Sequence, residues 1–240
     1  MTPPARRLPP LRIGFDMDGV IADFASAFHD VERRLFGPKA AVAAESPEIE
    51  AAREEQPAPA APRPRPTRPE QRRRRDAIWE AIHQTPDFWT TLEPLDPAAV
   101  PRIHEMMLRH CWEVFFITQR PATAGDTVQR QTQRWLRDQG FDMPSVLVIS
   151  GSRGMAAGAV RLNYHVDDSP QNCLDVVADA RAKPILIVRE PDSLTENSAR
   201  RLRISVARSI GEALDILERV SLAKDSPGML DKLSRMVGWT

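Results

Sequence analysis

Five short apolar runs recur along the 240-residue chain, and each is followed by polar or turn-forming residues. The runs occupy residues 11–16, 112–118, 145–150, 162–168 and 184–190. Most are nearly continuous and rich in β-branched or aromatic residues, which is typical of strands buried on both faces. Helical patterns lie between the runs, at 100–110, 126–140 and 169–181. Strands that alternate with helices predict an α/β fold built on a doubly wound parallel sheet.

The polar residues that follow these runs identify one edge of the predicted sheet. Parallel strands bring their carboxyl ends to the same edge, and ligands of doubly wound folds bind there. Five polar residues fall at these ends: Asp16, Thr118, Ser150, Asp167 and Asp168. The sequence therefore predicts a functional site at this edge.

The stretch from about residue 25 to residue 91 interrupts the alternation. It begins with an amphipathic helical pattern at 25–37 and continues into a segment, 44–69, in which proline alternates with alanine or arginine. Such a segment builds neither helix nor sheet and has little to bury, so we expect it to be disordered. The run Arg72–Arg75 then leads into a second helical pattern at 74–83.

This organisation predicts a core and an inserted cap. We expect the core to comprise residues 1–22 and 92–222, a small helical cap to be inserted after the first strand at 23–91, and a tail to follow at 223–240.

Charge and composition narrow the classes of partner. The chain carries 33 basic and 33 acidic residues, which argues against a whole-surface preference for nucleic acid or anionic membrane. The arginine run could tether RNA or an acidic partner. No aromatic residues interleave with these arginines, so a solvated linker and helix start is the favoured interpretation.

The cellular compartment is predicted from the absence of membrane-spanning and signal segments in the sequence. No apolar stretch reaches membrane-spanning length and the N-terminus has no apolar signal core, so we expect a cytoplasmic protein. Cys111 and Cys173 lie far apart without metal-type spacing. We expect them to be small buried side chains rather than a disulfide.

Asp16 and Asp18 lie one residue apart at the end of the first strand. Residues i and i+2 of a strand point to the same side, so both carboxylates would face one site, and Gly19 lets the chain turn sharply away. The pair Asp167–Asp168 ends another strand and would converge on the same spot. Such oxygen ligands suit a hard cation such as Mg²⁺, shared with a substrate phosphate. Either pair alone is better explained as surface aspartates, but both pairs at one edge favour a site.

Four motifs occur in order from residue 16 to residue 168: DMDGV, FFIT, a basic residue before a helix, and HVDD. They resemble the four motifs of the haloacid dehalogenase (HAD) superfamily of phosphotransferases. The resemblance implies that Asp16 is the nucleophile that becomes an aspartyl-phosphate, and that Asp18 protonates the leaving oxygen and then activates water. It implies that Thr118 hydrogen-bonds the phosphoryl oxygens. The implied Mg²⁺ ligands are Asp167, Asp168, Asp16 and the backbone carbonyl of Asp18.

The third motif departs from the superfamily pattern, which has a lysine. The segment SGSRGMAAG offers Arg153 instead, and the chain has no lysine between Lys39 and Lys183. Arginine keeps the positive charge, and its fork can grip phosphate in two places. Because arginine replaces lysine almost throughout the chain, we favour Arg153 as a working substitute, with Arg120 and Arg161 as nearby alternatives.

A narrower resemblance concerns the substrate. The segments DMDGVIADF, IWEAI and DFWTTLEPLDPAAVPRIHEM are similar to 5′(3′)-deoxyribonucleotidases and their bacterial relatives. Cap aromatics flank the nucleobase in that family, which implies that Phe24 and Trp79 line the substrate pocket. Packing of the cap onto the core is the alternative. Gln119 and Arg120 follow Thr118 where substrate phosphate contacts would lie, although Arg120 could equally pair with an acidic neighbour.

These observations favour a Mg²⁺-dependent phosphomonoesterase that hydrolyses 5′-nucleotides or deoxynucleotides. The alternatives are a catalytically weak HAD-fold phosphate-binding protein, a phosphatase of another small phosphorylated metabolite, and a core tethered to RNA by its arginine-rich insert. Two further residues carry expectations. Asp23 should cap the first cap helix, and His165 should lie near the carboxylates or pack under the sheet edge.

Overall fold

The structure is a computed structural model and describes residues 9–37 and 69–224. The segment expected to be disordered, 44–69, lies outside the described residues except for Pro69, which begins a helix. The expected tail, 223–240, lies outside them except for its first two residues.

Six parallel strands form one sheet in the order β3-β2-β1-β4-β5-β6. The strands are β1 (Arg12–Asp16), β2 (Glu113–Thr118), β3 (Ser145–Val148), β4 (Tyr164–Asp167), β5 (Lys183–Ile187) and β6 (Ser205–Ala207). Each of the five apolar runs overlaps one of the first five strands, which confirms the predicted parallel sheet. β6 was not predicted, because its three residues are too few to make a recognisable apolar run.

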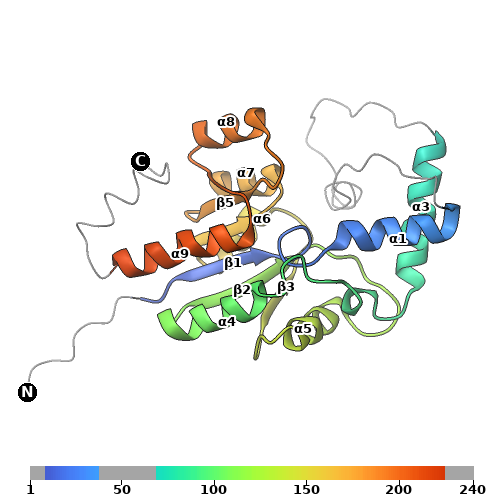
Figure 1. Ribbon diagram of the computed structural model, residues 1–240, viewed down its shortest axis with the longest axis horizontal. Coiled ribbons are helices and arrows are strands. Elements are labelled where there is room, and N and C mark those ends of the chain that lie inside the picture. Colours follow the sequence, from blue (N-terminus) through green and yellow to red (C-terminus); the bar gives the residue numbers. More distant parts are fainter. Residues whose placement is uncertain (1–8, 38–68, 225–240) are drawn as a thin grey trace, which may run out of the picture.

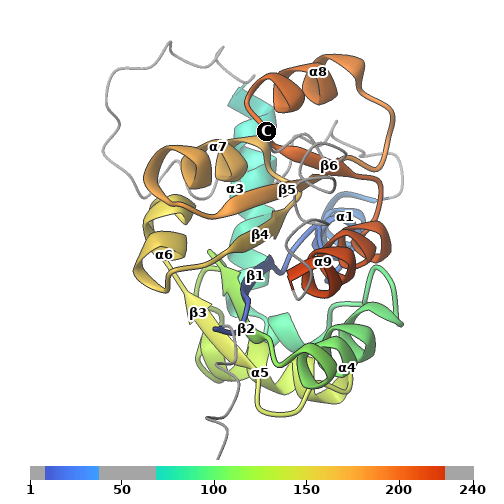
Figure 2. The same cartoon turned by 90° about the vertical axis from the view of Figure 1, so that its left-hand side faces the viewer.

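Helices cover both faces of the sheet (Figure 2). α4 (Ala99–His110), α5 (Val128–Asp138) and α9 (Ile210–Lys224) lie on one face, and α6 (Arg153–Ala159), α7 (Pro170–Asp179) and α8 (Ser193–Arg201) lie on the other. Phe15 and Phe116 of the sheet belong to one large apolar cluster with Leu217 of α9. Ile117 belongs to a smaller cluster with Val176 of α7. Among the described residues, no helix is both long enough and apolar enough to span a bilayer.

The register of the central strands brings the polar strand ends together. β1 lies between β2 and β4, with Asp16 opposite Ile117 and Phe15 opposite Val166. Asp16, the last residue of β1, therefore lies at the same sheet edge as the last residues of β2 and β4.

The chain leaves the core after β1 and returns before α4 through two adjacent segments, here called the neck (residues 21–23 and 93–95). The backbone N–H of Asp23 donates to the carbonyl of Glu93 at 2.8 Å, and that of Leu95 donates to the carbonyl of Ile21 at 2.8 Å. These bonds hold the departing and returning segments side by side, so the insertion begins and ends at one place.

Two helices, α1 (Phe24–Phe36) and α3 (Pro69–Gln84), pack against each other beyond the neck and extend away from the sheet (Figure 1). Asp23 caps α1 as predicted, because its side chain accepts a hydrogen bond from the N–H of Ser26 at 3.0 Å. α3 contains the whole arginine run. The guanidinium of Arg74 lies 4.7 Å from the ring centroid of Phe36, so this arginine helps to join the two helices.

Five aromatic side chains lie between these helices and the core, and we call them the cap aromatic cluster: Phe24, Phe28, Trp79, Phe88 and Trp89. The ring centroid of Phe24 lies 5.6 Å from that of Trp79 and 5.4 Å from that of Trp89. Phe88 and Trp89 belong to η1 (Phe88–Thr90), a short 3₁₀ helix on the returning segment. The cluster therefore joins both ends of the insertion.

Both cysteines are free, as predicted, but only Cys173 is buried. The expectation that Cys111 is buried was wrong. Cys111 ends α4 in the left-handed conformation, with φ at 54°, at the turn into β2. Such turns run over the protein surface, which leaves this side chain exposed.

Candidate active site

Asp16 ends β1, and its carboxylate is fully buried at the sheet edge. Its Oδ1 accepts a hydrogen bond from Nη2 of Arg153, whereas its buried Oδ2 has no hydrogen-bond partner among the described residues. Burial raises the pKa of Asp16 well above its usual value, Arg153 lowers it, and Asp167 and Asp168 raise it further. The carboxylate therefore needs more positive charge than Arg153 supplies if it is to stay ionised.

Arg153 is the first residue of α6, and its side chain is 1% exposed. Ser152 fixes the start of this helix by accepting a backbone hydrogen bond at the N-cap. Nε of Arg153 lies 3.4 Å from Oδ2 of Asp167, so the guanidinium reaches carboxylates on two strands. Of the two alternatives, Arg161 is exposed before the amino end of β4, and Arg120 contacts a different carboxylate.

Asp167 ends β4 and is fully buried among hydrogen-bond donors. Its Oδ1 accepts from the N–H of Ser169 at 2.9 Å and from Nδ2 of Asn172 at 3.1 Å, and its Oδ2 lies 2.9 Å from Nε2 of His165. Burial alone would raise the pKa of Asp167, but the contact with His165 and the charge of Arg153 hold it below its ordinary value. His165 thus lies directly against a carboxylate, which is one of the two positions expected for it.

Asn172 was not predicted as part of the site. It lies in the first turn of α7, three residues after the capping Ser169. Only the turn-forming sequence DDSPQN indicated a polar residue near this sheet edge.

Asp168 follows β4 and packs against the turn after β1. Gly19 has a positive φ of 81°, and a Cβ added there would lie 2.1 Å from Oδ2 of Asp168. Burial, and after it the charge of Asp167, raise the pKa of Asp168 to about 7 against the opposing charge of Arg189. Arg189, which donates to the carbonyl of Gly19, was also not predicted. It follows β5 at the same sheet edge, so the strand-end argument could have identified it.

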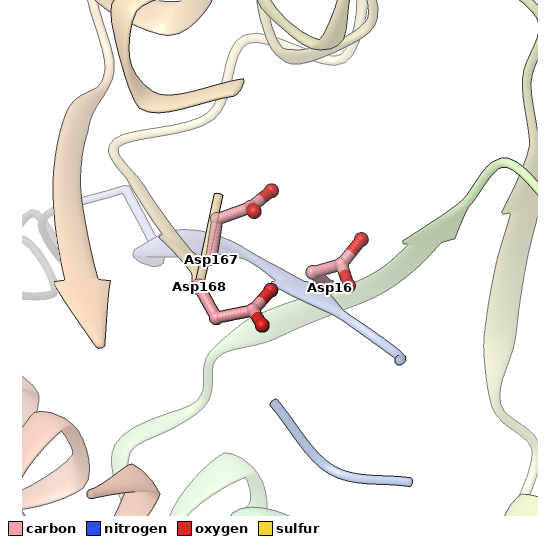
Figure 3. Close-up of side chains that lie close together, drawn as sticks. All are labelled: Asp16, Asp167 and Asp168. Carbon is pink, nitrogen blue, oxygen red and sulfur yellow. The ribbon is translucent and has the colours of Figure 1, made fainter. Parts of the chain in front are cut away.

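Three carboxylates form a candidate metal site (Figure 3). Asp16, Asp167 and Asp168 each offer one oxygen, and these oxygens lie within 4.8 Å of one another. Mg²⁺ prefers such oxygen ligands. The buried Oδ2 of Asp16 and the raised pKa values of Asp16 and Asp168 fit a group of residues built around a cation. The carbonyl of Asp18 remains a predicted fourth ligand.

Asp18 is not one of these three carboxylates, although its charge helps to raise the pKa of Asp16 and of Asp168, and it forms a buried ion pair with Arg120. Nε and Nη2 of Arg120 lie 2.7 Å and 2.5 Å from the two carboxylate oxygens. Two roles were considered for Arg120, and the structure shows the second of them, pairing with an acidic neighbour. The contact with substrate phosphate stays a prediction.

Thr118 and Gln119 lie at the end of β2, on the side of β1 that is opposite to β4. Thr118 ends β2 and is fully buried, and its Oγ1 lies 3.4 Å from the backbone N of Arg120, which donates to it. Gln119 donates from Nε2 to the carbonyl of Gly151 at 2.7 Å, which ties the end of β2 to the loop before α6. Both residues lie at the edge where they were expected.

Phe24 and Trp79 belong to the cap aromatic cluster. Phe24 is almost completely buried and stacks on Trp79, which is partly exposed. Both therefore help to pack the cap onto the core. Their predicted role in binding a nucleobase rests on the family resemblance.

Comparison with known proteins finds a family model that matches most of the chain. The family model described as 5′ nucleotidase, deoxy (pyrimidine), cytosolic type C protein matches residues 10–202. No curated protein sequence matches the chain.

Several solved structures share the fold. A HAD family hydrolase from Deinococcus radiodurans R1, solved with bound phosphate and sodium, is 15% identical with a TM-score of 0.51, covering 92% of this chain and 98% of that one. A phosphonoacetaldehyde hydrolase-like protein from Oleispira antarctica is 12% identical with a TM-score of 0.53, covering 90% and 94% of the two chains. A haloacid dehalogenase-like hydrolase from Streptococcus pneumoniae is 11% identical with a TM-score of 0.51, covering 87% and 98%.

The family match spans most of the chain, and the fold and the four motifs agree with it. The chain therefore belongs to the family described as 5′ nucleotidase, deoxy (pyrimidine), cytosolic type C protein, and it shares the fold of HAD family hydrolases.

Proposed function

We propose that this protein is a Mg²⁺-dependent phosphomonoesterase that forms an aspartyl-phosphate at Asp16 and hydrolyses 5′-nucleotides or deoxynucleotides. One observation carries the proposal. The buried carboxylate of Asp16 is held at one oxygen by Arg153, and its second oxygen has no hydrogen-bond partner among the described residues, while one oxygen of this carboxylate lies within 4.8 Å of oxygens of Asp167 and Asp168. A buried carboxylate in these surroundings is suited to bind a cation and to attack an electrophilic phosphoryl group.

In the first step, a carboxylate oxygen of Asp16 attacks the phosphorus atom, and the bond from phosphorus to the ester oxygen breaks. Asp18 gives its proton to that leaving oxygen. Arg153 balances charge at Asp16, and the hydroxyl of Thr118 donates to a phosphoryl oxygen. Bound Mg²⁺, held by Asp16, Asp167, Asp168 and the carbonyl of Asp18, would neutralise the phosphoryl oxygens.

In the second step, Asp18 takes a proton from water, whose oxygen attacks the phosphorus atom of the aspartyl-phosphate. The bond between phosphorus and Asp16 breaks. Inorganic phosphate leaves, and the carboxylate of Asp16 is restored with the proton back on Asp18.

The family match and the cap aromatic cluster support a nucleotide as the substrate. Trp79 is partly exposed and stacks on Phe24, so one of its faces or edges remains available to an aromatic ligand.

The test is phosphate release from a panel of nucleoside and deoxynucleoside 5′-monophosphates and other alkyl phosphates, in Mg²⁺ and in EDTA. We expect release that requires Mg²⁺ and that falls by more than about a thousandfold in Asp16→Asn, because the nucleophile is lost. Asp138→Asn, at an exposed carboxylate outside the site, is the matched control and should keep full activity. Equal rates in wild type and Asp16→Asn would refute the proposed function.

A further inference from the structure

The guanidinium of Arg120 donates hydrogen bonds to both carboxylate oxygens of Asp18. Nε of Arg120 lies 2.7 Å from Oδ2 and Nη2 lies 2.5 Å from Oδ1, and the two side chains are 1% and 2% exposed. A bidentate pair of this kind fixes the plane of the carboxylate as well as its position. Asp18 cannot rotate without breaking a buried, charge-assisted hydrogen bond.

Arg120 is itself braced from two other directions. Its Nη1 donates to Oγ1 of Thr132 on α5 at 3.1 Å, and its guanidinium carbon lies 4.8 Å from the ring centroid of Trp89. Trp89 belongs to η1, and its backbone N–H donates to Oε1 of Gln131, the residue before Thr132, at 3.1 Å. α5 and the segment that returns from the insertion therefore jointly fix the position of Arg120.

This arrangement leaves Asp18 able to react. A carboxylate offers about four acceptor sites, and Arg120 uses only one on each oxygen. One site on each oxygen remains for the proton that Asp18 would transfer to the oxygen of a leaving group. All three nitrogens of Arg120, in contrast, donate to side chains of the protein itself.

We propose that Arg120 is a positioning residue for proton transfer. It holds Asp18 in the orientation that delivers a proton to the leaving oxygen, and Thr132 and Trp89 hold Arg120. The inference rests on the proposed phosphatase reaction, in which Asp18 is the proton donor. Through Trp89, the orientation of Asp18 depends on the packing of the returning segment against α5.

The test compares kcat/KM for two phosphate monoesters. The leaving group of p-nitrophenyl phosphate departs without a proton, whereas the alkoxide of an alkyl phosphate needs one. The alkyl ester is the one that the wild-type enzyme cleaves fastest in the panel above. Asp18→Asn defines the signature of a lost donor, with a loss of about 10²–10⁴-fold on the alkyl ester and a much smaller loss on the aryl ester.

Arg120→Gln should reproduce this signature, with a loss on the alkyl ester at least about tenfold greater than on the aryl ester. Arg120→Lys keeps the charge without the fork and should fall between wild type and Arg120→Gln. Thr132→Val removes one brace and should act in the same direction to a smaller extent. Arg130→Gln is the matched control, because Arg130 pairs with Asp126 at 2.9 Å on the surface and is 72% exposed. It should leave the ratio unchanged.

Other outcomes overturn the inference. Equal losses on the two esters, with a lowered Tm, would mean that Arg120 only supports the fold. Equal losses with weaker inhibition by inorganic phosphate would mean that Arg120 binds the phosphoryl group. Wild-type enzyme that cleaves neither ester refutes the proposed function as well, whereas an active wild type with an unchanged ratio in Arg120→Gln refutes the positioning role alone.

Discussion

At the scale of single residues, the contacts of Arg153 indicate whether an arginine can act in place of the lysine that the third motif of the HAD superfamily has. Its guanidinium contacts Asp16 and lies 3.4 Å from Asp167, so one side chain serves two buried carboxylates. A lysine ammonium is a compact point charge on a flexible stem and lacks the planar fork. We therefore interpret the arginine as suited to this site.

Arg153→Lys should lower turnover by about tenfold rather than raise it, because the ammonium loses the contact with one of the two carboxylates. Steady-state kinetics on the best substrate of the panel measures this. Arg153→Met removes the charge as well and should lower turnover further. A large gain in Arg153→Lys would instead support the catalytically weak phosphate-binding protein.

Asp168 makes the stability of the metal-free protein depend on pH. Its pKa is about 7 in the folded state, well above the ordinary value of 3.8, because burial and Asp167 disfavour its charge. Between pH about 4 and about 7 the folded protein holds a proton that the unfolded chain has lost. The contribution of this group to the free energy of unfolding is therefore complete below pH about 4 and is lost as the pH rises through about 7.

Asp168→Asn removes this dependence. In EDTA the variant should have a higher Tm than wild type at pH 8, and the difference should shrink towards pH 4. Thermal unfolding followed by circular dichroism across this range measures it, with Asp142→Asn, at an exposed carboxylate, as the control. A constant difference across the range would contradict the assignment of the shift to Asp168.

At the scale of elements, α6 carries Arg153 and is placed by its contact with α7. Gly154 allows that contact, because a Cβ added there would lie 2.0 Å from the backbone carbonyl oxygen of Asp175. Gly158, in the same helix, is less crowded, with the carbonyl oxygen of Asp179 at 3.3 Å.

Gly154→Ala should destabilise the protein by about 1–3 kcal/mol and lower activity, because α6 must move and takes the neighbouring Arg153 with it. Gly158→Ala is the matched substitution. It should be much milder, since the gain in helix propensity of about 0.5–1 kcal/mol offsets a small shift of its neighbour. Chemical denaturation and kinetics on both variants test this. Equal effects would mean that the approach of α6 to α7 does not set the position of Arg153.

The predictability of the elements follows from how they are buried. Strands β1, β2, β4 and β5 are buried over most of their length and therefore appear as apolar runs. β3 lies at the edge of the sheet and is partly exposed, but its residues are still apolar enough to be recognised, whereas β6 is too short. α9 could have been predicted, because Ile210, Ala213, Leu214 and Leu217 are buried at helical spacing. α8 has too few apolar residues to indicate a buried face.

At the scale of the whole molecule, the candidate metal site joins β1 to β4. A ligand that binds only the folded protein raises the free energy of unfolding by about 2.7 kcal/mol at a hundred times its Kd. Mg²⁺ should therefore raise the Tm of wild type, relative to NaCl at the same ionic strength, and EDTA should reverse the rise. Asp168→Asn should lose most of the shift. An equal shift in both proteins would place the binding of Mg²⁺ outside this site.

The candidate site was predictable where it depends on strand ends and not where it depends on side-chain geometry. Asp16, Thr118, Asp167 and Asp168 follow from the sheet, because the carboxyl ends of neighbouring parallel strands meet. The pairing of Asp18 with Arg120 depends on where α5 and η1 lie, and no local pattern encodes that.

The neck also has a consequence for how chains of this architecture can diversify. Because Asp23 and Leu95 bond across it to Glu93 and Ile21, the insertion leaves the core and returns to it at one place. Each doubling of the length of a flexible closed loop costs only about 0.6 kcal/mol of entropy. An insertion that begins and ends at such a neck can thus change in length at little thermodynamic cost to the core. The neck thus separates the part of the chain that can vary in length from the sheet edge that carries the carboxylates.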